Sequence, residues 1–421
     1  MKSPQLKKLI TPALVTSLGL AGFAQAQTPR ASQDLTGAYG AFSEAALQSA
    51  AFDAFGEGFR DETPLGQALD YFKFGVNVKA EYNDNIFLTN AGEIDDVIIR
   101  VSVPLELSNS PDAENQWSLK YVPNFNFYAD NSDQDGVDHF VNAGYKRIFQ
   151  KTSVDFGVGY AKTQGADRFA SGSIEKTGLT TNLGLSHQLT GKSKLDLDLT
   201  ALSEDFVSNS LSDRERYNAR LNWQYQVTGK ISVGPYIAYE HSTTDGSFNP
   251  TQDAISFGAR GNYQALQKTT LIGYLGAEYR KFDGDGLEDK TSPTFEFGAQ
   301  HQLTGKTILT GMLYHNIRAS YSDAGQSYTA TGFNFLANYA ATARINARAG
   351  MSYEHDNYFG TSSAATGSLD SDYVTFFVGG DYVMDCGVTL GSGLRYSNND
   401  SETATRDFGN LIFNLSAGYS F

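Results

Sequence analysis

The chain has 421 residues, of which 42 are Gly, 24 Tyr and 28 Phe, and only 19% are charged. A formal net charge of −15 argues against nucleic acid as a partner. The single cysteine, Cys386, excludes an internal disulfide. A soluble protein this rich in aromatic residues would normally carry more charge, so the composition favours a membrane-facing sheet.

Residues 1–26 have the pattern of a cleavable secretory signal. Three lysines within the first eight residues precede an apolar stretch from Leu9 to Phe23, which ends in Ala24-Gln25-Ala26. Thr, Ser and Pro interrupt this short stretch, which argues against a permanent membrane anchor. The sequence therefore predicts export through the inner membrane. No later segment offers about 20 apolar residues in a row, so no α-helical membrane span is expected.

Residues 27–70 lack the alternation of a strand. Aromatic residues recur at mixed helical spacing between Tyr39 and Phe59, which favours a short helix there. Such a helix could plug the lumen of a barrel or lie on the periplasmic side. A flexible leader ahead of Pro64 is the alternative.

Residues 71–421 repeat short turn-like breaks at intervals of roughly 40 residues, a period that suits strand, long loop, strand and short turn. Examples are Thr190-Gly191-Lys192, Thr228-Gly229-Lys230 and Thr304-Gly305-Lys306. Between the breaks, apolar and polar residues alternate: in residues 217–227, Tyr, Ala, Leu, Trp, Tyr and Val alternate with Asn, Arg, Asn, Gln and Gln. This period of two places one set of side chains on each face of a sheet.

A soluble β-sandwich would also alternate, but two features favour a barrel in lipid. Many strands reach the length of roughly 9–11 residues that a tilted strand needs to cross a bilayer. Tyr, Phe and Trp gather near the strand ends, as in the aromatic girdles of such barrels. The predicted fold is thus an all-β, transmembrane, antiparallel up-and-down β-barrel.

Eight short turns, from Asn109–Glu114 to Asp385, give nine strand pairs, so we expect 18 strands, with 16 as the alternative. The short turns and both ends of the barrel would lie on the periplasmic side. The longer loops would then be extracellular, among them Thr163–Lys176 and Asp356–Asp370.

The last strand alternates from Leu411 to Phe421 and ends on an aromatic residue. That ending resembles the C-terminal signature of bacterial outer-membrane barrels, which implies recognition by the barrel-insertion machinery. The same strand must pair with the first one, because an open sheet edge is not tolerated in lipid.

The first predicted strand leads into Tyr82-Asn83-Asp84-Asn85-Ile86-Phe87, followed by Asp95-Asp96. This segment resembles the opening hairpin of porin-like outer-membrane barrel families of Gram-negative bacteria, some of which accompany exopolysaccharide export. The resemblance covers the barrel region and implies a porin-like role in the outer membrane. It supplies no catalytic residues.

No residue pattern indicates catalysis or a cofactor. The six histidines are scattered without metal-ligand spacing, and no Gly-x-Ser-x-Gly sequence occurs. Asn131, Asp133 and Asp135 followed by Gly136 resemble the front half of a calcium loop, but Asn142 stands where a bidentate Glu is required. We therefore expect no enzyme, no cofactor and no dedicated metal site, although divalent ions could bridge acidic loops to lipopolysaccharide phosphates.

The alternation turns charges of both signs toward the lumen, which indicates a wet interior or a network of ion pairs. Tyrosines on successive strands could also guide sugar rings along the wall. The predicted pore-lining residues are Arg220, Arg260, Arg280, Arg318, Arg348, Arg395, Glu240, Glu278, Glu296, Glu354, Tyr236, Tyr274 and Tyr314.

The leading functional hypothesis is a channel for passive diffusion of small hydrophilic solutes, with saccharides among the candidates. The alternative is a closed structural or exopolysaccharide-export-associated barrel without general pore activity. Expected partners are membrane lipid, lipopolysaccharide, the insertion machinery and the solutes. The sequence leaves open whether the barrel works alone or as a homo-oligomer.

Overall fold

The computed structural model describes residues 71–109, 114–170, 172–207, 211–245, 251–283, 288–321, 327–359, 370–402 and 404–420. The predicted signal (1–26), the predicted leader (27–70) and the terminal Phe421 lie outside the described residues, so the structure tests none of them.

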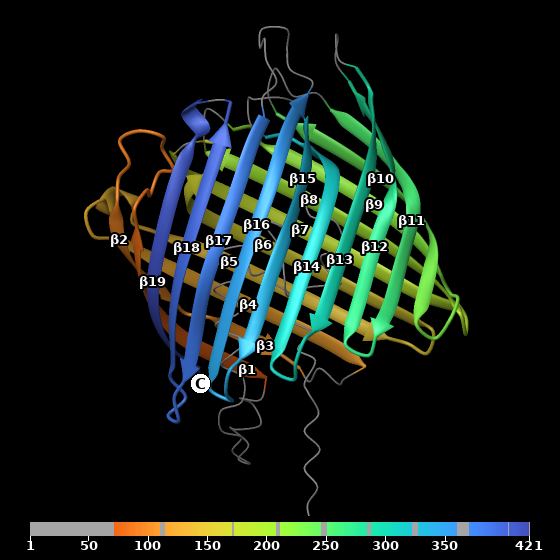
Figure 1. Cartoon of the computed structure of the whole chain (residues 1–421), viewed down its shortest axis with the longest axis horizontal. Coiled ribbons are helices and arrows are strands. Elements are labelled where there is room, and N and C mark those ends of the chain that lie inside the picture. Colours follow the sequence, from red (N-terminus) through yellow and green to blue (C-terminus); the bar gives the residue numbers. More distant parts are fainter. Residues whose placement is uncertain are drawn as a thin grey trace, which may run out of the picture.

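Nineteen strand segments form one closed antiparallel sheet (Figure 1). They are β1 (Phe72–Asn83), β2 (Asp96–Ser102), β3 (Leu105–Ser108), β4 (Asn115–Tyr128), β5 (Gly136–Ile148), β6 (Thr152–Asp167), β7 (Gly172–Thr190), β8 (Ser193–Val207), β9 (Arg214–Gln226), β10 (Ile231–Thr244), β11 (Gln252–Leu266), β12 (Thr269–Phe282), β13 (Lys290–Gln302), β14 (Thr307–Ala319), β15 (Ser327–Ala340), β16 (Ile345–Phe359), β17 (Asp370–Val383), β18 (Thr389–Ser401) and β19 (Phe408–Ser420).

Segments β2 and β3 are two parts of one barrel strand, because both pair with β1 on one side and with β4 on the other. Pro104 lies between them and has no N–H to donate to the ladder, which explains the break. The described chain thus forms an up-and-down barrel of 18 strands, closed by β1 against β19. The predicted fold and the predicted count of 18 strands are confirmed.

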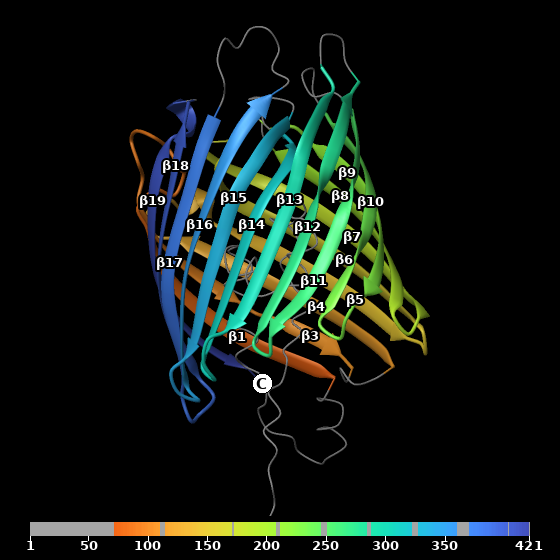
Figure 2. The same ribbon diagram turned by 45° about the vertical axis from the view of Figure 1, so that its right-hand side comes forward.

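The two faces of the sheet differ in polarity as the alternation predicts. Along β9, Leu221 and Trp223 are 40% and 42% exposed on the outer face, whereas Asn222 and Gln224 are 0% and 7% exposed on the inner face. Large apolar side chains exposed on the outside of a closed sheet are stable only in lipid. In Figures 1 and 2 the near and far walls cross in projection, as tilted strands of a barrel do.

Short turns gather at one end of the barrel, together with the C-terminus, and longer connections gather at the other (Figure 2). We call these the turn end and the loop end. The described helical residues form two short 3-10 turns at the loop end, η1 (Ser132–Gln134) and η2 (Ala404–Arg406). In the described part of the chain, no helix is long and apolar enough to cross a membrane.

Threonine side chains close several of the short turns. The Oγ1 of Thr228 accepts hydrogen bonds from the backbone N–H groups of Lys230 and Ile231, both at 3.1 Å. The Oγ1 of Thr342 accepts from Arg344 at 3.1 Å and Ile345 at 3.0 Å. The repeat seen in the sequence is therefore a turn in which a hydroxyl satisfies backbone donors that the hairpin leaves unpaired.

Replacing Thr228 by valine is expected to destabilise the barrel by roughly 1 kcal/mol, because two backbone N–H groups lose an acceptor while the shape of the side chain is kept. Urea denaturation of the detergent-solubilised barrel, followed by tryptophan fluorescence, measures the change. Thr228→Ser keeps the hydroxyl and serves as the control. Equal midpoints for the valine variant and the wild type would contradict the role of the hydroxyl.

Two predicted loops are shorter than the sequence suggested. The loop expected over Thr163–Lys176 is wrong, because β6 runs to Asp167 and β7 starts at Gly172, with these two residues paired. The start expected for the loop Asp356–Asp370 is also wrong, because β16 continues to Phe359. In both places polar residues continue the strand pairing, so a polar stretch in this chain does not by itself mark a loop.

Candidate functional site: the lumen and its crossing at the loop end

The thirteen predicted pore-lining side chains all lie on the inner face of the barrel. Arg280, for example, lies inside between the outward-facing Tyr279 and Lys281. Position on the inner face does not by itself make a residue part of a conducting path, so the pore-lining role of the thirteen stays a proposal.

Arg280 is the centre of an ion-pair network near the loop end. Its side chain is 1% exposed and donates from Nε to Glu278 at 2.9 Å, from Nη2 to Glu240 at 2.9 Å and from Nη1 to the Gln252 amide oxygen at 3.0 Å. The same Gln252 oxygen accepts a 2.7 Å hydrogen bond from Ser327 of β15. The network therefore links β10, β11 and β12 to β15.

Other inward charges are also paired across neighbouring strands. Arg348 of β16 donates to Asp381 of β17 at 2.8 Å, and Arg100 of β2 pairs with Glu81 of β1 at 3.2 Å, while Lys79 pairs with Glu81 at 2.7 Å within β1. Paired charges of this kind hold neighbouring strands together and reduce the net field that a solute meets in the lumen.

The predicted tyrosines do not form a continuous track. The rings of Tyr236 and Tyr274 meet edge to face at 5.5 Å between centroids. Tyr314 lies in a separate buried cluster with Met312, Tyr328, Ala330 and Tyr358. The structure thus brings two of the three tyrosines together and leaves the third apart.

Each of these rings lies along the wall with a guanidinium over it. The Cζ atom of Arg220 is 5.6 Å from the Tyr236 centroid and 5.1 Å from that of Tyr274, and Arg318 lies 5.2 Å from Tyr314. The rings are 3–7% exposed. Cation–π contact and burial therefore occupy the ring faces that a sugar would need.

Glycines give two of the tyrosines room to lie flat. A Cβ atom added at Gly276 would lie 2.6 Å from the Tyr236 hydroxyl oxygen, and one added at Gly332 would lie 2.6 Å from that of Tyr314. The absence of a side chain at these glycines is therefore part of the same arrangement.

A side chain from one wall crosses the lumen to the opposite wall at the loop end. Arg168 follows β6, and β6 and β16 lie on opposite sides of the strand order. Its Nη2 donates to Glu354 Oε1 at 2.7 Å and to Asp356 Oδ2 at 2.8 Å, both on β16. This contact makes Arg168 a bridge across the barrel.

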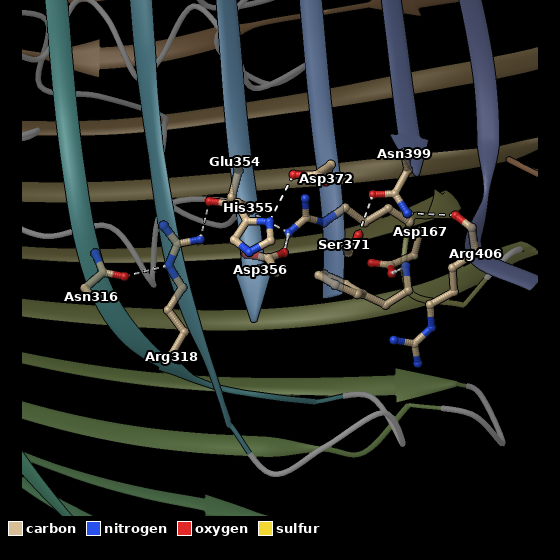
Figure 3. Close-up of polar contacts among 12 residues, drawn as sticks. Asp167, Asn316, Arg318, Glu354, His355, Asp356, Ser371, Asp372, Asn399 and Arg406 are labelled. Atoms are coloured by element: carbon tan, nitrogen blue, oxygen red, sulfur yellow. Dashed lines mark hydrogen bonds and ion pairs between the residues drawn. The ribbon is translucent and has the colours of Figure 1, made fainter. Parts of the chain in front are cut away.

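One acceptor of this bridge, Glu354, is held in place from its own side of the barrel. Arg318 points toward Glu354 (Figure 3) and donates from Nη1 to Glu354 Oε2 at 2.7 Å, and the Tyr314 hydroxyl donates to the same oxygen at 2.8 Å. Asp356 is completely buried. Glu354, one of the two carboxylates that bind Arg168, is thus also held by Arg318 and Tyr314.

Aromatic rings and carboxylates both stabilise the Arg168 guanidinium. Its Cζ atom lies 4.9 Å from the ring centroid of Tyr373 on β17 and 4.4 Å from that of Phe169. Burial opposes the charge, but the carboxylates of Asp356 and Glu354 outweigh it and raise the pKa of Arg168 well above its ordinary value. Arg168 is therefore charged throughout the physiological pH range.

Tyr321, which follows β14, makes a second contact across the lumen. Its ring stacks on Phe206 at 5.0 Å and meets Phe169 edge to face at 5.2 Å. Its carbonyl oxygen accepts a 2.9 Å hydrogen bond from the Ser212 N–H, and Arg214 donates to the neighbouring Ala319 carbonyl at 3.2 Å. Ala319 and Tyr321, at and just after the end of β14, are therefore held to residues of β8, of β9 and of the connection between them.

Together Arg168, Phe169, Tyr321, Glu354 and Asp356 form what we call the mouth crossing. Only Glu354 was predicted from the sequence. Arg168 and Asp356 were assigned to loops, and continued alternation through Ser352, Glu354 and Asp356 was the signal that would have placed Asp356 inside. No local sequence pattern predicts that Tyr321 contacts the opposite wall.

The residues that resemble half of a calcium loop make hydrogen bonds that stabilise the loop between β4 and β5. Asp135 accepts a 2.7 Å hydrogen bond from the Tyr128 N–H, and Asn131 donates to Asp96 from its backbone at 3.0 Å and its side chain at 2.9 Å. Across the described ranges, no group of three or more His, Cys, Asp or Glu side chains is placed to hold a metal ion.

No protein-family model matches the chain, and no curated protein does. Solved structures match at low identity. OpdK of Pseudomonas aeruginosa, solved with vanillate, is 11% identical over 83% of this chain and 99% of its own, with a TM-score of 0.43. OccAB3 of Acinetobacter baumannii is 10% identical over 83% and 99% (TM-score 0.44), and the FrpB iron transporter of Neisseria meningitidis is 11% identical over 83% and 81% (TM-score 0.45).

These identities and TM-scores are too low to carry a function over to this chain. What can be concluded comes from the barrel itself: a closed antiparallel sheet with an apolar outside and a charged inside. The described chain is an outer-membrane-type β-barrel whose lumen is crossed at the loop end.

Proposed function

We propose that the protein is a porin-like channel of the outer membrane through which small hydrophilic solutes diffuse passively, and that the mouth crossing limits the flow. The observation that carries the proposal is a charged inner face in a barrel of 18 strands. Barrels of 16–18 strands leave room for an aqueous channel, and charged walls are stable only where water or ion pairs satisfy them.

The proposal includes the predicted surroundings of the barrel. The chain would be exported, inserted by machinery that reads its C-terminal strand, and surrounded by lipid and lipopolysaccharide, alone or as a homo-oligomer. It acts without catalysis or cofactor. Saccharides belong among the solutes to be tested, although the guanidinium groups over Tyr236, Tyr274 and Tyr314 weaken the case for sugar stacking at these rings.

Single-channel recording in planar lipid bilayers tests the proposal. Stepwise currents from the purified barrel are expected, and liposome swelling in sugars of increasing size then gives the size limit. A barrel that conducts neither as the full chain nor after deletion of residues 27–70 would overturn the channel proposal.

The mouth crossing is also the observation that favours the alternative, a closed structural or export-associated barrel. Ion pairs and stacked rings there join opposite walls. Currents that appear only after deletion of residues 27–70 would place the block in that segment, and currents that appear only after loss of Arg168 would place it at the mouth crossing.

A modest preference for cations is expected at low salt, because the chain carries a formal net charge of −15 and acidic surfaces concentrate cations near a pore. Reversal potentials in a KCl gradient measure it. The preference should shrink at high salt, where the Debye length falls to about 3 Å at 1 M. A reversal potential that favours chloride at low salt would contradict this expectation.

A further inference from the structure

The Asn83-Asp84-Asn85 segment lies where the barrel closes. The closing pair is β1 against β19, with Asn83 opposite Ile412 as its last residue pair toward the loop end. Beyond that pair the regular backbone ladder stops, but the contact between the first and last strands continues through one backbone hydrogen bond and several side chains.

Asp84 and Asn85 satisfy the backbone of β19 beyond the ladder. The Asp84 N–H donates to the Leu411 carbonyl at 3.2 Å, and Asp84 Oδ1 accepts from the Leu411 N–H at 2.7 Å. Asn85 Nδ2 donates to the Gly409 carbonyl at 3.0 Å. Two side chains from the start of the barrel thus take the place of a paired strand.

Asn410 of β19 donates hydrogen bonds back to the end of β1 and the segment that follows it. Its Nδ2 donates to Asn83 Oδ1 at 2.6 Å and to the Asn85 carbonyl at 3.1 Å. Asn85 is completely buried and Asn410 is 3% exposed, so an unpaired amide at either position would be costly. We call Asn83, Asp84, Asn85 and Asn410 the seam clasp.

Chain connectivity does not set the register of the closing pair. Short turns fix the register of strands that follow one another, but no turn joins β1 to β19. A slip of one residue is excluded, because it would turn apolar side chains inward. A slip of two residues keeps apolar residues outside and polar residues inside, so alternation cannot distinguish it from the observed register.

We infer that the seam clasp selects the register in which the barrel closes. Asn410 meets Asn83 and Asn85 only in the observed register, since a slip of two residues would move it by about 7 Å along the strand. Partners separated by 324 to 327 residues can meet only once the first and last strands come together. The seam clasp therefore stabilises the observed register when the first and last strands come together.

Disulfide trapping of the closing pair tests this inference. In a Cys386→Ser background, cysteines at Ala80 and Leu415 report the observed register, because these residues are partners. Cysteines at Ala80 and Phe413, or at Ala80 and Ala417, report slips of two residues. With the clasp intact, only the first pair should cross-link on mild oxidation.

Combined Asn85→Ala and Asn410→Ala substitutions should produce a cross-linked band for at least one slipped pair and weaken the native band. Asn399→Ala is the matched control: this buried asparagine of β18 also makes side-chain hydrogen bonds, but it lies outside the closing pair. Heat-modifiable migration on SDS gels shows that each variant forms a barrel. Asn410→Ser alone, which removes the amide donor, is used if the double variant does not insert. A clasp variant that cross-links only at Ala80 and Leu415 overturns the inference.

Discussion

Replacing Arg168 by alanine is expected to raise single-channel conductance, with the average open current increasing at low and high salt alike. Arg168 links the end of β6 to the β16 carboxylates, with contacts of 2.7 and 2.8 Å to Glu354 and Asp356. Removing one partner of a buried ion pair leaves uncompensated charge, at a cost of roughly 3–5 kcal/mol. The two walls should therefore lose their connection at the mouth crossing, and water should enter between them. Planar-bilayer recording of both proteins measures the change.

Arg344→Ala is the control for the loss of one positive charge. Arg344 pairs with Asp385 in an exposed contact at the turn end, far from the mouth crossing. Its loss should leave the conductance unchanged, because exposed ion pairs contribute little. Arg168→Lys should give an intermediate current, since an ammonium keeps the charge but not the planar fork. Equal conductance of Arg168→Ala and the wild type would exclude the mouth crossing as the limiting constriction.

Replacing Arg280 by methionine is expected to destabilise the barrel more than any other single change in the wall considered above. Arg280 donates to Glu278, Glu240 and Gln252, and it is 1% exposed. Methionine fills similar volume but leaves two carboxylates without their main partner, which costs roughly 3–5 kcal/mol. The midpoint of unfolding in urea, with the barrel in detergent, gives the loss.

A second variant separates charge from packing. Adding Glu240→Gln and Glu278→Gln to Arg280→Met removes the uncompensated charges and should recover much of the lost stability. Arg348→Met, which breaks one contact to Asp381 at a more exposed position, should cost less. If the triple variant is no more stable than Arg280→Met, then packing and not charge explains the effect.

The sequence could predict the barrel architecture because a lipid environment requires apolar residues on the outer face of every strand. A strand that faces lipid on one side and a charged interior on the other must alternate, as Leu221, Asn222 and Trp223 do. The threonine of each Thr-Gly-Lys repeat marks a turn by the hydrogen bonds it accepts from nearby backbone groups. Both signals are local, so the sequence could predict the number of strands and the face of the sheet on which each charged residue of the wall lies.

Contacts between distant strands could not be predicted in this way. Arg168 lies 186 residues from Glu354 in sequence, and Asn85 lies 324 residues from Gly409. Polarity alone predicts an external loop for Arg168, although its side chain is only 17% exposed and pairs with the opposite wall. Likewise the Asn83-Asp84-Asn85 motif carried a family resemblance in the sequence, whereas its hydrogen bonds to β19 emerge only when the sheet closes.

The sequence by itself determined that this chain forms an antiparallel barrel with a polar interior and regularly spaced short turns, because these follow from alternation and turn chemistry, and it predicted 18 strands with 16 as the alternative. Only the tertiary structure decided which inward charges pair, which tyrosine faces are covered, where opposite walls meet and how the first strand is held to the last. Those contacts depend on the register of many strands at once, and no window of sequence contains that register.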